Sequence, residues 1–540
     1  MLPIRFLFQY FPPLHKPIIR LPHTPNMHKI PFNGRLLIMG YGSVSQCTLP
    51  LVLKHFDMPK EKITVLDMED YNADVSSLGV RFVQEKITEE NLQQILAKYV
   101  GRGDLIIDLT WNIECNEILD WCHNNEVLYA NTSVEKWDPY ANAKNARTTD
   151  RTLYVRQMAL RKLINSWGNK KGTTAVVDHG ANPGLVSHFT KVGLIDIAEK
   201  ILAEKPNDPR AGDIRSALEG KQYNKLSQLV GVKVIHISER DTQISSRPKE
   251  VNEFVNTWSI EGFYEEGTAP AEMGWGTHEH ILPPGARLHQ NGPRNQICLA
   301  RYGINTWVRS WVPCGEILGM VIRHGEAFSI SDYLTVNDDL GSPVYRPTVH
   351  YAYCPCDAAI ASLHELRMRN YKMQENLRIM DDDITSGRDE LGVLIMGHDF
   401  KSWWVGSLLD IEETRQLVPG QNATTLQVAI SVLACASWMI KNPNEGVNLP
   451  DQLPHDEILD IAKPYLGPFV SKPVNWTPEP SSPAHHGVTP DGDLDIWQFH
   501  NFLITEDLTA PAEGESADEV VNEVPSNTPQ EIPMAEPVLI

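Results

Sequence analysis

Short apolar runs alternate with amphipathic stretches along the first third of the chain. The apolar runs lie at 36–39, 63–66, 105–109, 127–130 and 173–177. Their length and composition predict buried strands, and the spacing of apolar residues in 89–99 and 116–123 predicts helices between them. Strands that alternate with helices in this way predict a parallel α/β sheet.

A glycine turn follows the first apolar run. Gly40 allows a tight turn, and Gly42 lets a phosphate approach the backbone where the next helix begins. Free N–H groups and the helix dipole favour an anion at that place. We assign Ser43 and Val44 to the same cofactor-binding loop. A glycine pair alone is a weak signal, so this interpretation depends on the strands around it.

An acidic residue at the end of the second run strengthens the cofactor prediction. Asp67 stands at about the distance expected for the acid that binds the ribose hydroxyls of the adenosine. No arginine stands beside it, which favours NAD over NADP. We also assign Thr110 and Thr132, which follow later strand-like runs, to the cofactor site. The pattern predicts a Rossmann-type NAD-binding domain over 34–180.

A second chemical signal is the mixture of acidic and aromatic residues between 238 and 280. Trp258 and Trp275 stand among acidic side chains there. The acids are Glu239, Asp241, Glu261, Glu265, Glu266, Glu272 and Glu279. Carboxylates pair with an ammonium group, and an indole face attracts the same charge, so the stretch suits an organic cation. Taken singly, each acid fits a solvated surface and each tryptophan fits a core.

Several long segments of the chain, in order over roughly 32–504, carry a family resemblance. They are GYGSVSQCTLPL from Gly40, HGANPGLVS from His179, ISERDTQ from Ile237, FVNTWSIEGFYEEG from Phe254, PAEMGWGTHE from Pro270, VYRPTVHYAYCPC from Val344 and QNATTLQV from Gln421. The chain resembles the bacterial-type homospermidine synthases, which belong to a wider group similar to saccharopine dehydrogenase. These segments are far more specific than the glycine loop.

The resemblance implies a fold and a reaction. The implied fold is α/β, with the N-terminal Rossmann-type NAD domain, a large α+β substrate and dimerisation domain, and a chain that returns to the first domain near its end. The implied reaction is the condensation of two putrescine molecules to homospermidine with release of ammonia. NAD would be recycled as a bound hydride carrier. Spermidine as a substrate remains open.

The resemblance also implies site residues. The implied catalytic residues are Asn182, Glu239, Trp258 and His324, and the implied substrate-binding residues are Glu135, Glu239, Trp258 and Glu266. In this set Trp258 offers its face to the substrate cation, Glu239 lies at the inner amino group and Glu266 lies near the mouth. Considered alone, Asn182 before Pro183 is a turn residue, and a single histidine such as His324 is more often a satisfied core residue.

Two other functions remain open. A reductive condensation of the saccharopine or carboxynorspermidine dehydrogenase type would consume its cofactor and would need an arginine fork for a carboxylate. Arg240, Arg301 and Arg309 are available for that role, although the excess of acid around Trp258 speaks against it. A non-catalytic NAD-binding protein is the other alternative, and the intact set of Glu239, Trp258 and Glu266 speaks against it.

Composition and charge restrict the possible functions of the protein further. The 540-residue chain has a formal net charge of −21, which argues against a nucleic-acid partner because phosphate binding needs a basic face. The eight cysteines include no CxxC pair, so we predict no metal site, reduced thiols and a cytoplasmic protein. No run of 18 apolar residues is present, so we expect no membrane span.

The remaining segments complete the predicted organisation. Residues 1–33 contain no acid and many prolines, which predicts an unstructured extension or a true start at Met27; a targeting segment fits less well. Residues 181–410 form the predicted substrate domain and 411–505 a helical return segment. Its apolar stretch 423–440 predicts a buried helix or an oligomer interface. The acidic tail 506–540 should be disordered, and the resemblance implies a homodimer.

Overall fold

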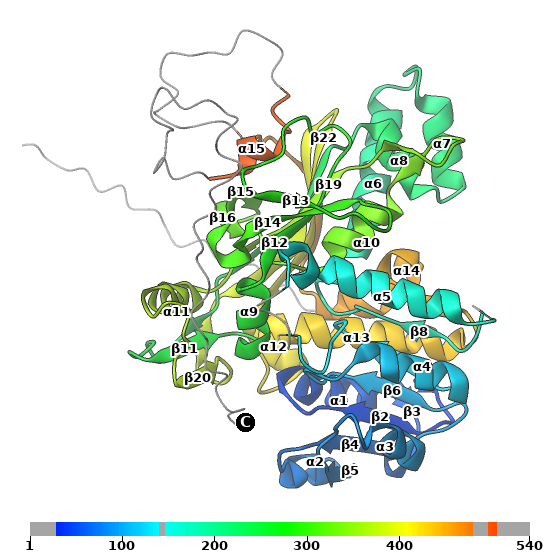
Figure 1. The fold of residues 1–540 in the computed structure, drawn as a ribbon, viewed down its shortest axis with the longest axis vertical. Helices are drawn as coiled ribbons and strands as arrows, with labels where there is room; N and C mark the ends of the chain where they lie inside the picture. The colour runs from blue at the N-terminus through cyan, green and yellow to red at the C-terminus, as the bar shows by residue number, and fades with distance from the viewer. Residues whose placement is uncertain (1–28, 140–145, 170, 479–494, 505–540) are drawn as a thin grey trace, which may run out of the picture.

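Two sheets dominate the computed structural model, which describes residues 29–139, 146–169, 171–478 and 495–504 (Figure 1). A seven-stranded parallel sheet is built mainly from the N-terminal part of the chain, and a ten-stranded mixed sheet is built from the rest. This confirms the α/β class with a Rossmann-type first part and a larger α+β second part. The acidic tail 506–540 lies outside the described residues, as does most of the predicted N-terminal extension.

The parallel sheet has the strand order of a Rossmann fold. Its strands, from edge to edge, are β24 (Val447–Asn448), β8 (Ala175–Val176), β7 (Leu128–Asn131), β6 (Leu105–Asp108), β2 (Leu36–Met39), β4 (Ile63–Asp67) and β5 (Arg81–Gln84). Every neighbouring pair is parallel. The apolar runs thus form the predicted strands, because strands covered on both faces need continuous apolar sequence.

Helices cover both faces of this sheet. They are α1 (Ser43–His55), α2 (Asn72–Ser77), α3 (Leu92–Tyr99), α4 (Cys115–Asn125) and α5 (Leu153–Ser166). The stretches 89–99 and 116–123 are thus confirmed as helices, with shifts of a few residues at the ends. Residues 29–33 belong to the predicted extension, yet β1 (Ile30–Pro31) pairs with β3 (Phe56–Asp57) and Phe32 is buried. The short strand at that place is held by the burial of Phe32.

The chain returns to the parallel sheet late in the sequence, as predicted. Helix α13 (Ala423–Lys441) packs against α1 and β7, and β24 then pairs with β8 at the sheet edge. Helix α14 (His455–Ala462) packs on α13. By length and composition α13 could cross a membrane, but 89% of its apolar window is buried inside the chain. It is therefore a buried core helix and not the oligomer interface that its composition also allowed.

The mixed sheet carries most of the candidate site. Its main path runs β13 (Ala286–Leu288), β14 (Gln296–Tyr302), β12 (Pro270–Gly274), β19 (Thr348–Cys354), β9 (Val234–Asp241), β22 (Arg388–His398), β23 (Lys401–Asp410) and β25 (Phe469–Val474). The hairpin of β15 (Trp307–Val312) and β16 (Gly315–Met320) joins at β19. β9 and β19 are parallel neighbours near the centre, so residues at their ends meet.

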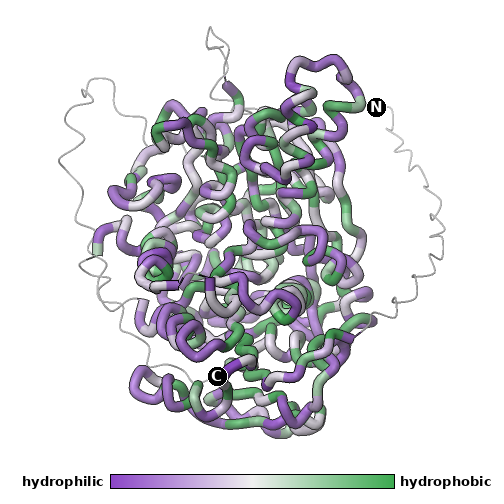
Figure 2. The backbone as a smooth tube through the Cα atoms, turned by 90° about the vertical axis from the view of Figure 1, so that its right-hand side faces the viewer, coloured by the Kyte–Doolittle hydropathy of each residue, from purple (hydrophilic) through white to green (hydrophobic). Residues whose placement is uncertain are grey.

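Helices and short strands complete this part. The helices are α6 (Leu185–Glu204), α7 (Ala211–Glu219), α8 (Tyr223–Val230), α9 (Ile260–Gly267), α10 (Gly325–Tyr333), α11 (Asp357–Met368), α12 (Ile411–Leu417) and α15 (Phe499–Phe502). The short pairs are β10 (Ile244–Ser245) with β21 (Ile384–Ser386), β11 (Glu253–Asn256) with β20 (Asn376–Ile379) and β17 (Val336–Asn337) with β18 (Pro343–Tyr345). Along the whole backbone, hydrophilic and hydrophobic stretches are interspersed (Figure 2).

Two members of the acidic and aromatic stretch hold the fold together and lie away from the candidate site. Trp275 packs against Phe499 of α15 with ring centroids 6.0 Å apart. Glu279 accepts hydrogen bonds from the Phe499 backbone N–H at 2.9 Å and from the Thr348 hydroxyl at 2.6 Å. Trp275 thus packs as expected of a core tryptophan, whereas Glu279 is a buried, hydrogen-bonded acid and not the solvated one that its type suggested.

Candidate active site

The glycine loop forms a tight turn at the end of β2. Gly40 has a positive φ of 82°, and a Cβ there would lie 2.7 Å from the Leu109 carbonyl oxygen, so glycine is required. Gly42 precedes the first turn of α1, and a Cβ placed on it would meet no described atom within 4 Å. Ser43 and Val44 begin α1. The backbone at Gly42 is thus open to a phosphate group.

Asp67 ends β4 beside this loop. One carboxylate oxygen accepts a hydrogen bond from the Tyr41 N–H at 2.6 Å, and the other accepts from the Glu69 N–H at 2.8 Å. Thr110 follows β6, where its hydroxyl donates to Asp108, and Thr132 follows β7. These residues line the carboxyl ends of parallel strands, where such sheets bind dinucleotides. The arrangement fits NAD, and Asp67 together with Glu69 would repel the 2′-phosphate of NADP.

Glu239 lies at the centre of the predicted amine site. It stands on β9 and is 3% exposed. Its carboxylate accepts a hydrogen bond from Asn182 Nδ2 at 2.9 Å and another from the Tyr351 hydroxyl. Burial raises the pKa of Glu239 to about 7, and the neutral donors oppose that rise. Both donors are neutral, and His324 acts on this carboxylate through its charge alone, so no described cationic side chain is hydrogen-bonded to it.

Trp258 precedes α9 and is fixed at one edge. Its Nε1 donates to the Tyr353 hydroxyl at 2.9 Å, and its ring packs against Phe263 with centroids 5.3 Å apart. Tyr353 stacks on Tyr351 at 5.1 Å, and the latter holds Glu239. The indole and the carboxylate are therefore connected through two tyrosines of β19.

His324 lies between two carboxylates at the start of α10. Its Nε2 is 3.0 Å from Glu266 Oε2, and its Nδ1 is 3.4 Å from Glu326 Oε1. Burial disfavours the charged ring, but Glu266 and Glu326 outweigh burial and raise the pKa of His324 well above its usual value. The two carboxylates thus favour the protonated ring of His324. Its ring also contacts Tyr351, with centroids 4.3 Å apart.

A buried group of charges lies beside these residues. Glu265 accepts hydrogen bonds from both Arg156 and Arg323, and all three side chains are 6% exposed. Glu135 accepts from the Ser133 hydroxyl at 2.6 Å, and its other oxygen is 3.9 Å from Arg156. Burial, followed by the charge of Glu265, raises the pKa of Glu135 to about 7.

A pair of buried acids holds the segment that precedes Trp258. Asp241 on β9 is the cross-strand partner of Asp389 on β22. Asp241 accepts from the Thr257 hydroxyl and Asp389 from the Thr424 hydroxyl, each at 2.7 Å. Burial raises the pKa of both acids. This network ties the segment that carries Trp258 to the first turn of α13.

Sequence reasoning found the acids and the indole but missed their partners. Tyr351, Tyr353, Arg156 and Arg323 were not predicted to belong to the site. In the parallel register Tyr353 lies opposite Glu239, so pairing of distant strands creates these contacts. The segment from Val344 to Cys356 was noted for its resemblance. Side chains two positions apart on a strand share one face, and this rule could have predicted that Tyr351 and Tyr353 lie together.

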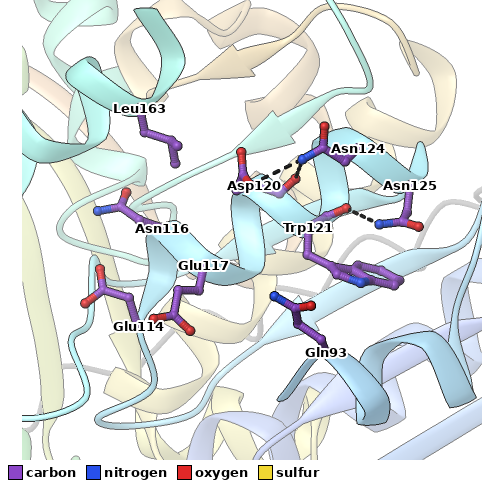
Figure 3. A pocket seen from close by; sticks show the side chains of 9 residues that line it. All are labelled: Gln93, Glu114, Asn116, Glu117, Asp120, Trp121, Asn124, Asn125 and Leu163. Atoms are coloured by element: carbon purple, nitrogen blue, oxygen red, sulfur yellow. Dashed lines mark hydrogen bonds between the residues drawn. The ribbon is translucent and has the colours of Figure 1, made fainter. Parts of the chain in front are cut away.

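One surface depression lies outside this cluster. It has a volume of 490 Å³ and is lined by residues of α3, α4 and α5 together with Glu114 (Figure 3). Two of its three acids, Glu117 and Asp120, project from α4, the third is Glu114, and Trp121 lies along one side (Figure 3). None of the predicted site residues lines it. The depression therefore has no part in the cluster around Glu239.

The fold and the site define a broad class. The family of the saccharopine dehydrogenase NADP binding domain matches residues 36–176, and that of the saccharopine dehydrogenase C-terminal domain matches residues 180–474. The protein is thus a nicotinamide-dependent enzyme of the saccharopine dehydrogenase type.

Closer relatives narrow this class. The homospermidine synthase of Blastochloris viridis is 40% identical over 494 residues, which cover 89% of this chain and 99% of the relative. The homospermidine synthase of Mesorhizobium japonicum is 38% identical over 483 residues, or 87% and 96% of the two chains. The chain belongs to the homospermidine synthase family. A crystal structure of the Legionella pneumophila homospermidine synthase with NAD shares 36% identity and a TM-score of 0.77, covering 88% of this chain and 99% of that one.

Proposed function

We propose that the protein is a homospermidine synthase that joins two putrescine molecules, releases ammonia and uses NAD without consuming it. Family membership supports the reaction. Within the structure, the observation that carries the proposal is Glu239, a buried carboxylate that is held by Asn182 and Tyr351 and connected to the Trp258 indole through Tyr351 and Tyr353. Such a group can stabilise an ammonium ion, because no described cationic side chain is hydrogen-bonded to it and the nearby charge of His324 is already paired with Glu266 and Glu326.

Gly40, Gly42, Ser43, Val44, Asp67, Thr110 and Thr132 would hold NAD. The loop N–H groups at Gly42 and the first turn of α1 suit the pyrophosphate, and Asp67 suits the ribose hydroxyls. When bound, NAD supplies a place to store the hydride taken from the carbon next to a putrescine nitrogen until it is returned to the new imine. The protein residues must bind, orient and protonate the amines.

Glu239 and Trp258 would hold the reacting nitrogen. The carboxylate pairs with the ammonium group, and the indole face stabilises the same charge by about 0.5 to 2 kcal/mol depending on desolvation. A pKa of about 7 lets Glu239 take a proton from the amine and give it back at neutral pH. Asn182 keeps the carboxylate in place. Glu135, whose pKa is also about 7, is a second proton acceptor beside the site.

Glu266 and His324 would serve the outer end of the diamine. Glu266 is 30% exposed and paired with His324, so an arriving ammonium group can reach it from solvent. The imidazolium of His324 orients this carboxylate and can donate a proton to departing ammonia. Water must be kept from the imine, and the burial of Glu239 and Tyr351 supports such exclusion.

The carboxylate-substrate alternative fits these contacts less well. Arg240 is engaged by Asp357 at 2.7 Å and by the Pro355 carbonyl. The two buried arginines beside the site, Arg156 and Arg323, are both bonded to Glu265. An arginine already bonded to a protein carboxylate is a poor fork for a substrate carboxylate.

One assay tests the proposal. Purified protein is incubated with putrescine and a trace of NAD, and the amines are separated by chromatography while absorbance of NADH is followed. We expect homospermidine and ammonia with no steady accumulation of NADH. Stoichiometric NADH without homospermidine would show a simple amine dehydrogenase instead.

We also propose a cytoplasmic homodimer and keep the division into a cofactor domain at 34–180, a substrate domain at 181–410 and a return segment at 411–505. Light scattering of the purified protein tests the dimer. A monomer at all concentrations would contradict it.

A further inference from the structure

Trp111 is an exposed tryptophan placed where the two parts of the molecule meet. It lies in the loop after β6, two positions beyond Leu109, and is 48% exposed. No other tryptophan within the described ranges is exposed to this extent. Burial of such a ring normally stabilises a protein. An indole that remains exposed to water therefore indicates a binding role.

The indole is nevertheless held in place. Its Nε1 donates a hydrogen bond to Glu265 Oε2 at 3.2 Å, across from the parallel sheet to α9. Glu265 is itself fixed by Arg156 and Arg323. One edge of the ring is therefore anchored on a rigid charged group, while its accessible surface faces water.

An acid stands next to this anchor. Glu266 follows Glu265 on α9 and is 30% exposed. Its Oε2 contacts His324, whereas its Oε1 makes no hydrogen bond with any residue that the structure describes. An exposed indole and an available carboxylate oxygen thus come from different segments and are linked through Glu265, which holds the indole and precedes Glu266 on α9. This is the same pair of groups that Trp258 and Glu239 present in the interior.

We propose that Trp111 is an aromatic wall of the mouth, which together with Glu266 binds an ammonium end of the incoming aliphatic diamine. The ligand class is a primary ammonium group on a flexible alkyl chain. The inference rests on the proposed function and deepens it, because it adds a second cation-binding indole to the site. An indole at an exposed position strengthens cation binding by roughly two- to fivefold.

A bridging role is the competing explanation. If Trp111 only joins the two parts of the molecule through its N–H, phenylalanine and leucine will be equally harmful, because neither donates to Glu265. If the ring face binds a cation, phenylalanine retains part of the effect and leucine retains none. The two substitutions therefore separate the explanations.

The kinetic test compares wild type with Trp111→Phe, Trp111→Leu and the control Trp121→Leu, all with NAD bound. Trp121 belongs to the same part of the molecule but lines the depression on α4. We expect the putrescine KM to rise by roughly two- to fivefold for leucine, by less for phenylalanine and not at all for the control. Equal KM values, or equal losses for phenylalanine and leucine, would overturn the proposal.

A binding test keeps this inference separate from the proposed reaction. Butane-1,4-bis(trimethylammonium) cannot be oxidised to an imine at its quaternary nitrogens, so its Kd needs no turnover. Calorimetry is done on Trp258→Ala holoprotein, from which the inner indole is absent, with and without Trp111→Leu. A weaker Kd with Trp111→Leu supports the wall even if no homospermidine forms. An unchanged Kd contradicts it even if the synthase reaction is found.

Discussion

Asn182 Nδ2 donates to Glu239 Oε2 over 2.9 Å, which joins the turn after β8 to the middle of the substrate site. The turn is compact because Gly184 has a φ of 131°, and a Cβ there would lie 1.7 Å from the Gly180 carbonyl oxygen. A position so crowded admits only glycine. The rigid turn places Asn182, and the hydrogen bond from Asn182 fixes the orientation of the Glu239 carboxylate, on which the rest of the site depends.

The two acids of the amine site should respond differently to loss of charge. Glu239→Gln leaves a buried ammonium unpaired, at a cost of about 3 to 5 kcal/mol, and should nearly abolish kcat. Glu266→Gln, which is closer to solvent, should mainly raise the putrescine KM. Steady-state kinetics measure both effects. Small and equal effects at both positions would show that the amine site lies elsewhere.

Trp258 separates packing from catalysis. If the ring only packs, Trp258→Phe and Trp258→Ala lower stability by a few kcal/mol, roughly in proportion to the cavity, and the folded fraction keeps its activity. If the face holds a cation, activity falls in the order Trp, Phe, Ala while NAD affinity stays constant. We expect the second pattern, measured by kcat and by NAD titration of each folded variant. Wild-type turnover in folded Trp258→Ala would end the cation-holding role.

The two glycines of the cofactor loop should fail for different reasons. Gly40→Ala puts a side chain against Leu109 at a positive φ, so its melting temperature should drop. Gly42→Ala has free space around it and an ordinary φ of −71°, so the protein should remain stable. Its methyl group would occupy the approach of the pyrophosphate and weaken NAD binding. Thermal melting and NAD titration distinguish the two outcomes, and unchanged NAD affinity in Gly42→Ala would remove the loop from the cofactor site.

Lys191 of α6 predicts a pH effect on stability. It is buried, donates to the Leu453 carbonyl at 2.7 Å and lies 5.4 Å and 5.3 Å from the ring centroids of Tyr223 and Tyr333. Burial lowers its pKa to about 8, and the charge of Asp451 opposes that shift. The unfolded chain, with an ordinary lysine pKa of about 10.4, binds a proton that the folded protein releases above pH 8.

Stability contributed by this group must therefore rise with pH between those two values. Relative to Lys191→Met, the wild-type free energy of unfolding should increase by about 2 kcal/mol from pH 7.5 to 9.5. Denaturant titrations at the two pH values measure the difference. A constant gap between the two proteins would mean that Lys191 keeps its proton in the folded state.

Local patterns explain why much of the fold was predictable. Buried parallel strands need continuous apolar runs, and the turn at Gly40 needs a residue without a side chain, so both features can be recognised from a few neighbours. The acidic and aromatic stretch around Trp258 was recognised in the same way, since acid and indole stand close together in sequence, but the individual roles of Glu239, Trp258 and Glu266 came from the family resemblance. Resemblance to a family supplied Asn182, Glu135 and His324, which local pattern alone does not distinguish.

The remaining contacts depend on long-range pairing. Tyr351 reaches Glu239 only because β19 lies parallel to β9, and the two residues are separated by 112 positions. Glu265 is bonded to arginines from α5 and from the segment before α10, and no short motif relates them. Trp275 and Glu279 stand in the acidic and aromatic stretch, but both contact Phe499 of α15. Spacing along one strand cannot show which neighbour that strand will choose.

The pairing of β24 with β8 has a consequence for synthesis. Strand β24, residues 447–448, pairs with the free edge of β8. Strand β8, Ala175–Val176, leaves the ribosome more than half a chain earlier. Until that late segment emerges, the nascent protein carries an open strand with unpaired N–H and C=O groups, a surface prone to mispairing with other chains. Chaperone dependence should therefore be greatest for chains stalled just before residue 447.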